Sequence, residues 1–133
     1  MVVEHDGIKI IHDFNESLIE FDTALSGVTT DNQFVIYYAK LQDYIMHKQV
    51  RYLVVTKKNN HFELSADFNK FRQKVFIVDL LRKGIEQIFY LVSASKTKKY
   101  RKLLPDYVQV VNSHEEINAI IKEKRNFEAV NNN

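Results

Sequence analysis

The sequence predicts an α/β domain, with a mixed and mainly parallel sheet of four to five strands, an antiparallel edge strand and flanking helices. Residues 50–56 (Val-Arg-Tyr-Leu-Val-Val-Thr) form a short apolar run rich in β-branched side chains, which is typical of a parallel strand buried on both faces. Strand-like and helix-like patterns alternate along the rest of the chain. Three glycines and one proline in 133 residues are few for an all-β protein, which needs many tight turns.

The first half of the chain predicts a β-hairpin followed by a helix. Residues 8–22 contain two strand-like stretches on either side of a turn at residues 13–16, and the second stretch alternates with a period near two. A loop with good N-cap residues then precedes a helix over residues 32–47, in which apolar side chains recur at intervals of three and four. This helix leads into the strand at residues 51–56.

A long helix is predicted to begin near residue 64 and to end at Gly84, a residue that readily adopts the left-handed conformation. Its apolar side chains recur at intervals of four and three, and we expect them to form the buried face: Leu64, Phe68, Phe71, Val75, Val78 and Leu81. The remaining elements are, in order, a strand at residues 85–92, a helical turn at 100–104, a strand at 107–111 and a last helix from Ser113 to about Arg125.

Composition restricts the class of protein. A chain that is 45% hydrophobic and 27% charged is globular, and we expect one domain over residues 1–125 with a frayed polar tail over residues 126–133. The net charge of +2 creates no global field that would favour nucleic acid or a membrane as partner. The absence of cysteine excludes disulfides, thiolate zinc sites and cysteine nucleophiles, and it fits a cytoplasmic protein. We expect no signal peptide and no membrane span.

Recognisable catalytic motifs are missing. The five histidines lack the spacing of metal ligands, and neither a glycine-rich phosphate loop nor a nucleophile elbow occurs. We therefore expect no enzyme, no cofactor and no metal. One enzymatic alternative stays open: His61 with Asp67 or Glu63 would form an acid–base pair if these side chains converged in a cleft.

Basic residues follow two of the predicted strands. If residues 51–56 and 87–92 are parallel neighbours, the segments after them leave the same edge of the sheet, where α/β proteins usually bind ligands. The N-terminus of the long helix lies at that edge as well, and its N–H groups favour anions. We expect a site there that binds an anion or a partner, formed by Lys57, Lys58, Lys96, Lys98, Lys99 and Arg101.

The order of these elements, together with the segment Val110-Val111-Asn112-Ser113-His114-Glu115-Glu116-Ile117, resembles the STAS-like, SpoIIAA-like domains, in particular their small stand-alone bacterial forms. The resemblance covers about residues 8–124. It implies a mixed sheet flanked by helices and no intrinsic catalysis. Classical members carry, after the central strand, an Asp-Ser-(Ser/Thr)-Gly-like segment whose serine is phosphorylated by a partner kinase. Residues 56–65 lack that segment, and their hydroxyl groups, Thr56 and Ser65, are the candidate phosphoacceptors.

We expect a non-enzymatic regulatory or protein-interaction module that docks an anionic or polar protein partner at the edge formed by residues 56–65 and 93–102. Nucleic acid is disfavoured, because Tyr100 is the one aromatic residue within the basic run. The alternative is a small ligand or lipid in an apolar pocket under the helix at residues 62–71. Surplus apolar positions leave a homodimer open: Phe76, Ile77 and Leu80.

Overall fold

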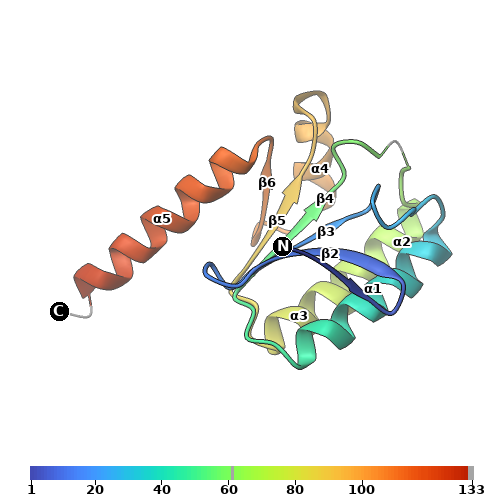
Figure 1. The fold of residues 1–133 in the computed structure, drawn as a ribbon. Helices are drawn as coiled ribbons and strands as arrows, with labels where there is room; N and C mark the ends of the chain where they lie inside the picture. Colours follow the sequence, from blue (N-terminus) through green and yellow to red (C-terminus); the bar gives the residue numbers. More distant parts are fainter. Residues whose placement is uncertain (61, 132–133) are drawn as a thin grey trace.

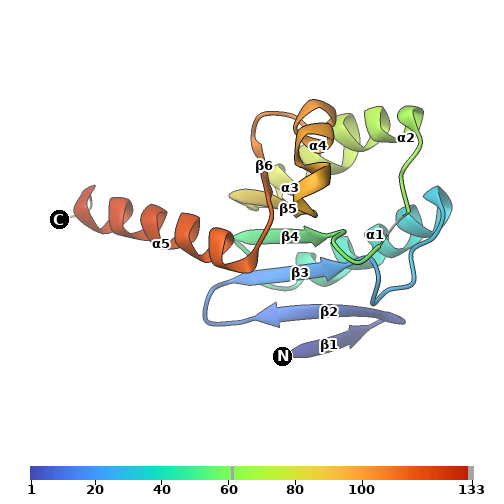
Figure 2. The ribbon, with the colours of Figure 1, turned by 90° about the horizontal axis from the view of Figure 1, so that it is seen from above.

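Six strands form one mixed sheet in the computed structural model, which describes residues 1–60 and 62–131 (Figure 1). The strands lie side by side in the order of the sequence (Figure 2): β1 (Val2–His5), β2 (Ile8–Asp13), β3 (Leu18–Asp22), β4 (Tyr52–Thr56), β5 (Gln87–Leu91) and β6 (Val108–Val111). The pairings β1–β2 and β2–β3 are antiparallel, and the three pairings that follow are parallel. The predicted α/β class is confirmed, with six strands in place of four or five.

The additional strand is β1, at the edge of the sheet. It pairs with β2 so that Val3 lies opposite Ile10. Asp6 and Gly7 connect the two strands with φ angles of 51° and 84°, and two successive positive φ angles are what a two-residue type I′ hairpin turn requires. Asp-Gly is a strong sequence signal for such a turn, so the sequence does contain the information for this strand, although the predicted elements did not include it.

Helices cover the two faces of the sheet unequally, with α5 on one side and the other helices opposite (Figure 1). In chain order they are α1 (Asp31–Met46), α2 (Ala66–Phe71), the π-helical η1 (Arg72–Ile77), α3 (Val78–Arg82), the 3₁₀ turn η2 (Ala94–Lys96), α4 (Thr97–Leu103) and α5 (His114–Asn131). Side chains of β4 alternate between the faces: Leu53 and Val55 join the core under α1, whereas Tyr52 and Val54 pack with α5. The prediction that this strand is buried on both faces is confirmed.

The predicted buried face of the long helix is wrong in its middle. Phe71 and Val75 are 47% and 44% exposed, whereas Arg72 and Ile77 are almost completely buried. The physical reason is the π-helical segment η1, which runs directly on from α2 and into α3. A π-helix bonds i to i+5, so it shifts the side chains relative to a regular helix, and the interval of four and three no longer follows one face.

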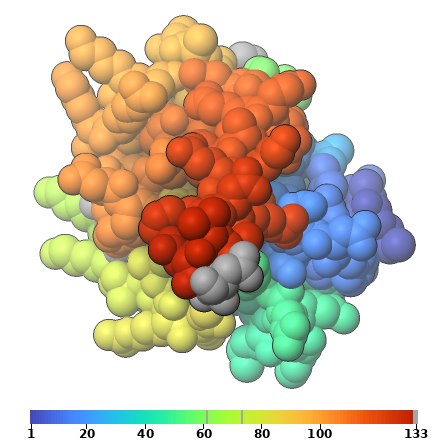
Figure 3. Space-filling model, turned by 90° about the vertical axis from the view of Figure 1, so that its left-hand side faces the viewer, coloured from blue at the N-terminus to red at the C-terminus, as the bar shows by residue number. Residues whose placement is uncertain are grey.

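Two further expectations change. The basic run at residues 96–102 lies mostly in the helix α4, whereas the sequence predicts a helical turn only from residue 100. The last helix does not end at Arg125 but continues to Asn131, where the sequence predicts a frayed tail. Figure 3 shows this end of the molecule, with the last turns of α5, in dark red, towards the viewer.

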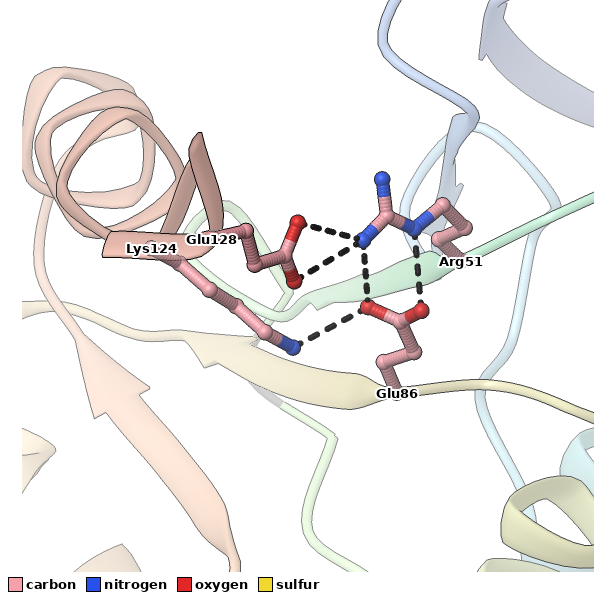
Figure 4. A network of polar contacts seen from close by, with 4 residues as sticks. All are labelled: Arg51, Glu86, Lys124 and Glu128. Carbon is pink, nitrogen blue, oxygen red and sulfur yellow. Dashed lines mark hydrogen bonds and ion pairs between the residues drawn. The ribbon is translucent and has the colours of Figure 1, made fainter. Parts of the chain in front are cut away.

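A network of ion pairs holds the C-terminal half of α5 against the neighbouring segments (Figure 4). The Arg51 guanidinium donates to both carboxylate oxygens of Glu86 at 3.0 and 2.9 Å, and to Glu128 in α5 at 3.2 Å. Lys124, one turn earlier in α5, donates to Glu86 at 3.1 Å. These contacts join the helix to the residues that precede β4 and β5. Among the described residues, no helix combines the length and apolar character needed to cross a lipid bilayer.

The contact between Arg51 and Glu128 predicts that Glu128→Gln loosens the last turns of α5. We expect amide hydrogen exchange at residues 126–131 to accelerate about twofold to fivefold, because a partly exposed ion pair in a network contributes roughly 0.5–1 kcal/mol. Lys122→Gln, at an exposed position of the same helix, is the control. Equal exchange rates in the variant and the parent protein would contradict this role.

Candidate functional site

The carboxyl ends of β4 and β5 lie side by side, as the sequence predicts. The two strands pair in parallel with Thr56 opposite Leu91, and the Lys57 amide continues the ladder by donating to the Leu91 carbonyl at 2.9 Å. The segments that follow the two strands therefore leave the same edge of the sheet. This arrangement determines which side chains meet there.

A small pocket of about 140 Å³ lies between these two segments. A cavity of this size holds about four to five water-sized groups. Its wall combines four residues after β4 with five at and after the end of β5: Lys57, Lys58, Asn60, Glu63, Val92, Ser93, Ser95, Lys96 and Tyr100. The pocket can accept a carboxylate, a phosphate or another small polar group.

Glu63 is held at one wall of this pocket by three donors. The ammonium groups of Lys96 and Lys99 lie 2.8 and 3.1 Å from its carboxylate oxygens, and the Tyr100 hydroxyl donates to it at 3.2 Å. Partial burial acts to raise the pKa of Glu63, but the hydrogen bonds from the two lysines outweigh it and lower this pKa to about 2. The wall is thus already organised to bind a carboxylate.

Lys57 is another lining residue of the pocket and lacks a comparable partner. Its exposed fraction is 6%, and its Nζ has no hydrogen-bond partner among the described residues. The ammonium lies over the rings of Phe62 and Tyr100, at 5.7 and 5.4 Å from their centroids. Burial, together with the charge of Arg72, lowers the pKa of Lys57 to about 8.

Arg72, the first residue of η1, is a second buried cation. It is fully buried, and none of its guanidinium nitrogens has a hydrogen-bond partner in the described part of the chain. The guanidinium lies over the ring of Tyr90, 5.0 Å from the centroid. A buried charge without a partner is expensive, so two of them near one another indicate a site that favours an anion.

The structure brings together four of the six predicted cations. Lys57, Lys58 and Lys96 line the pocket, and Lys99 reaches its wall through Glu63. Arg101 does not line this pocket but borders a different hollow, together with Leu104, Pro105, Asp106, Val108, Gln109 and Val110. Lys98 is exposed on the same helix and is not among the residues that line the pocket. The sequence predicts all six cations at one edge of the sheet. Three of them, Lys98, Lys99 and Arg101, lie in α4, and successive residues of a helix point to different faces.

Asn112, after β6, holds the two basic segments in place. Its carbonyl accepts from Lys58 Nζ at 3.2 Å. Its side-chain amide donates to the Val92 carbonyl at 3.1 Å and to the Thr97 hydroxyl at 2.7 Å. Sequence reasoning missed this residue and Arg72. For Arg72 no clear signal existed, because the helix contains other charged and polar residues, among them Lys70, Lys74 and Arg82.

The two predicted phosphoacceptors lie in different environments. Thr56 is the last residue of β4 and is buried, so its hydroxyl is inaccessible to a kinase. Ser65 is exposed at the N-cap of α2, where its Oγ accepts from the Phe68 amide at 3.2 Å. The enzymatic alternative depends on His61, which lies outside the described residues. Glu63, one of its two proposed partners, forms ion pairs with Lys96 and Lys99.

Aromatic rings fill the space under the long helix in the described structure. The ring centroids of Tyr38 and Phe76 are 4.7 Å apart and the two rings stack. The ring centroid of Phe68 lies 5.7 Å from that of Phe34 and 6.2 Å from that of Phe76. The apolar-ligand alternative therefore gains no support from the geometry. Tyr100 is buried, so it offers no exposed face on which a nucleic acid base could stack. Among the described residues, no three histidine, aspartate or glutamate side chains gather as metal ligands.

In comparison with known proteins, the chain matches no protein-family model, no curated protein and no solved structure.

The buried ammonium predicts that Lys57→Met stabilises the protein at pH 7, by about 1–3 kcal/mol. The pKa of Lys57 is about 8 in the fold and 10.5 in its ordinary environment, so the folded state binds fewer protons between these values. The buried ammonium destabilises the fold by its full amount below pH 8, and this destabilisation decreases as the pH rises towards 10.5. Urea denaturation at pH 7 and pH 10 measures both the gain in the free energy of unfolding and its decrease at high pH.

Lys58→Met, at the exposed neighbouring position, is the control for this measurement, and we expect it to change stability by less than about 0.5 kcal/mol. If Lys57→Met destabilised the protein at pH 7, the ammonium would contribute to the fold through its aromatic contacts instead.

Proposed function

We propose that this protein is a non-enzymatic interaction module that docks an acidic segment of a protein partner at the pocket between the ends of β4 and β5. The observation that carries the proposal is the way the site binds Glu63. Two lysines and a tyrosine hydroxyl already hold one carboxylate there, at 2.8, 3.1 and 3.2 Å. A carboxylate or phosphate of a partner would use the same kind of donors.

The carboxylate of Glu63 does not neutralise the lysines around the pocket. Lys57, Lys58, Lys96 and Lys99 contribute four cations against this one carboxylate. The Lys57 ammonium beneath it has no hydrogen-bond partner among the described residues. A second anionic group in the pocket would therefore meet an uncompensated charge in a partly desolvated place, where electrostatic attraction is stronger than at an open surface.

The resemblance to STAS-like, SpoIIAA-like domains supports a regulatory role of this kind in the cytoplasm. In that role, phosphorylation of Ser65 would control docking. Support for this variant is the exposed position of Ser65 at the N-cap of α2, where a phosphate is favoured by the helix N-terminus. The partner would then be a protein rather than a nucleic acid, and a homodimer is a further arrangement that the module would permit.

The docking proposal predicts that Lys96→Gln together with Lys99→Gln weakens binding of a fluorescein-labelled peptide rich in glutamate and phosphoserine. We expect a loss of about tenfold or more, because each lost charge-assisted hydrogen bond contributes roughly 1–2 kcal/mol. Fluorescence anisotropy at fixed ionic strength measures the affinity. The matched control is Lys98→Gln with Arg101→Gln, which removes the same charge from other faces of α4. An equal loss in both double variants would contradict a pocket-specific site.

The internal carboxylate competes with a partner for the same donors, so we predict that Glu63→Gln increases affinity for the acidic peptide. Removal of one competing charge next to Lys96 and Lys99 should raise affinity about threefold to tenfold. Glu123→Gln, at an exposed position of α5, makes the same change in net charge elsewhere. Should both substitutions raise affinity equally, the effect would come from net charge and not from the occupied site.

A further inference from the structure

We propose that β1 is a docking edge for a second copy of this chain, so that two sheets join antiparallel, β1 against β1, into one continuous sheet. The partner is thus the protein itself. This pairing goes beyond the docking of an acidic segment and uses none of the residues that line the pocket between β4 and β5.

β1 lies at the open end of the sheet. It pairs with β2 alone, and no other element of the described chain lies beyond it (Figure 2). Its register with β2 is continuous from Val2 to His5, without a bulge, and the strand contains neither proline nor lysine. Bulges, prolines and lysines are the devices by which proteins commonly keep an exposed edge from pairing with another chain. β1 therefore keeps the capacity to accept one more strand.

The hydrogen-bond pattern identifies the backbone groups of β1 that are available. The His12 amide donates to the Met1 carbonyl at 2.8 Å, and the Met1 nitrogen donates to the His12 carbonyl at 3.3 Å. Because such bonded pairs alternate along an antiparallel ladder, Val3 also points its amide and carbonyl towards β2. Val2 and Glu4 point theirs outward, and both residues are exposed. A further strand would find two donors and two acceptors there.

The opposite edge of the sheet, along β6, is less open. Val111 bonds to the segment after β5, so alternate residues on either side of it point outward, among them Val108 and Asn112. The Val108 amide already donates to the Pro105 carbonyl at 3.0 Å. The Asn112 amide donates to the Glu116 carboxylate at 3.3 Å. The edge at β1 is therefore the better acceptor of a strand.

A second copy of β1 complements this edge in one register. When Val2 lies opposite Glu4 of the second copy, the outward groups of the two strands form four hydrogen bonds, and the two Val3 residues face each other on a two-fold axis. Val3 is half-buried at the end of a row of core side chains that begins with Phe21 and Ile10. The second Val3 would bury it further, so that the apolar row continues across the interface.

Charge and shape permit this register. On the other face of the sheet, Glu4 lies beside Lys9 of its own chain and opposite Val2 of the second copy, so no like charges lie directly opposite each other. α1 packs on β1 and β2, and the two β2 strands would lie about 14 Å apart, three strand spacings. Packed helices need about 8–10 Å, so the two copies of α1 would not collide.

Sedimentation velocity of the full chain between about 10 and 500 µM tests for the dimer, because association depends on concentration and small interfaces are weak. We expect the weight-average sedimentation coefficient to rise towards that of a dimer. Glu4→Pro removes an outward amide without removing a bond to β2, and it should weaken the dimer about tenfold or more. Glu4→Gln keeps this amide and should keep the dimer.

Opposed charges test the register. Val3→Lys and Val3→Glu should each abolish the dimer, because identical charges would then face each other on the axis. An equimolar mixture of the two variants should restore the association as a heterodimer, which native mass spectrometry distinguishes by its mass. Circular dichroism establishes that each variant is folded.

Cysteine cross-linking gives a further readout. The chain has no cysteine, so Val3→Cys forms a disulfide only with a second copy. Opposed residues of a non-hydrogen-bonded pair have Cα atoms about 4.5 Å apart, within the range that a disulfide spans. With oxidised glutathione, we expect Val3→Cys to cross-link at least about tenfold faster than Gln109→Cys, at the exposed position of β6, because docking raises the effective concentration.

A single monomeric species up to the highest concentration would overturn the proposal, and so would equal cross-linking of the two cysteine variants. A dimer that withstands Glu4→Pro would use another surface and would overturn it as well. Folded Val3→Lys and Val3→Glu that stay monomeric when mixed would overturn the register. The dimer and the docking function fail independently, because these variants leave the pocket intact and peptide binding is measured on them by fluorescence anisotropy.

Discussion

The parallel pairing of β4 with β5 is the contact on which the candidate site depends. It places Thr56 beside Leu91, so the chain segments that follow them border one pocket although they are more than thirty residues apart in sequence. A shift of one residue in this register would turn Lys57 to the other face of the sheet. The ladder continues into the site, because the Lys57 amide bonds to the Leu91 carbonyl. The first residue of the pocket wall is therefore held by the sheet itself.

The site contains positive charge that the fold itself does not balance. Glu63 compensates Lys96 and Lys99 at the wall of the pocket, whereas Lys57 and Arg72 lie deeper, without hydrogen-bond partners in the described structure. Buried cations reduce stability unless an anion or a proton loss relieves them. Natural proteins retain such strain mainly where it serves a function, and the π-helical turn that begins at Arg72 is itself a feature often found at functional sites.

Pattern reasoning on the sequence succeeded for the sheet and failed for details of the helices. Runs of β-branched residues located β4 and β5, and their order implied that the two basic segments share an edge. The buried face of the long helix was wrong because one π-helical segment breaks the periodicity, which leaves Phe71 exposed and Arg72 buried. Arg72 was missed for a general reason: hydrophobic patterning assigns every arginine to the surface. The pairing of Glu63 with Lys96 joins residues far apart in sequence, and only the fold brings them together.

Lys57 and Arg72 differ in how their positive charge can be relieved. A guanidinium stays protonated at any physiological pH, so Arg72 is a fixed charge that disfavours the protonated form of Lys57. An anion bound in the pocket would have the opposite effect, because it stabilises the nearby ammonium and raises the pKa of Lys57. Docking of an acidic group and protonation of Lys57 are therefore coupled: the anion favours the charged lysine, and the charged lysine strengthens binding of the anion.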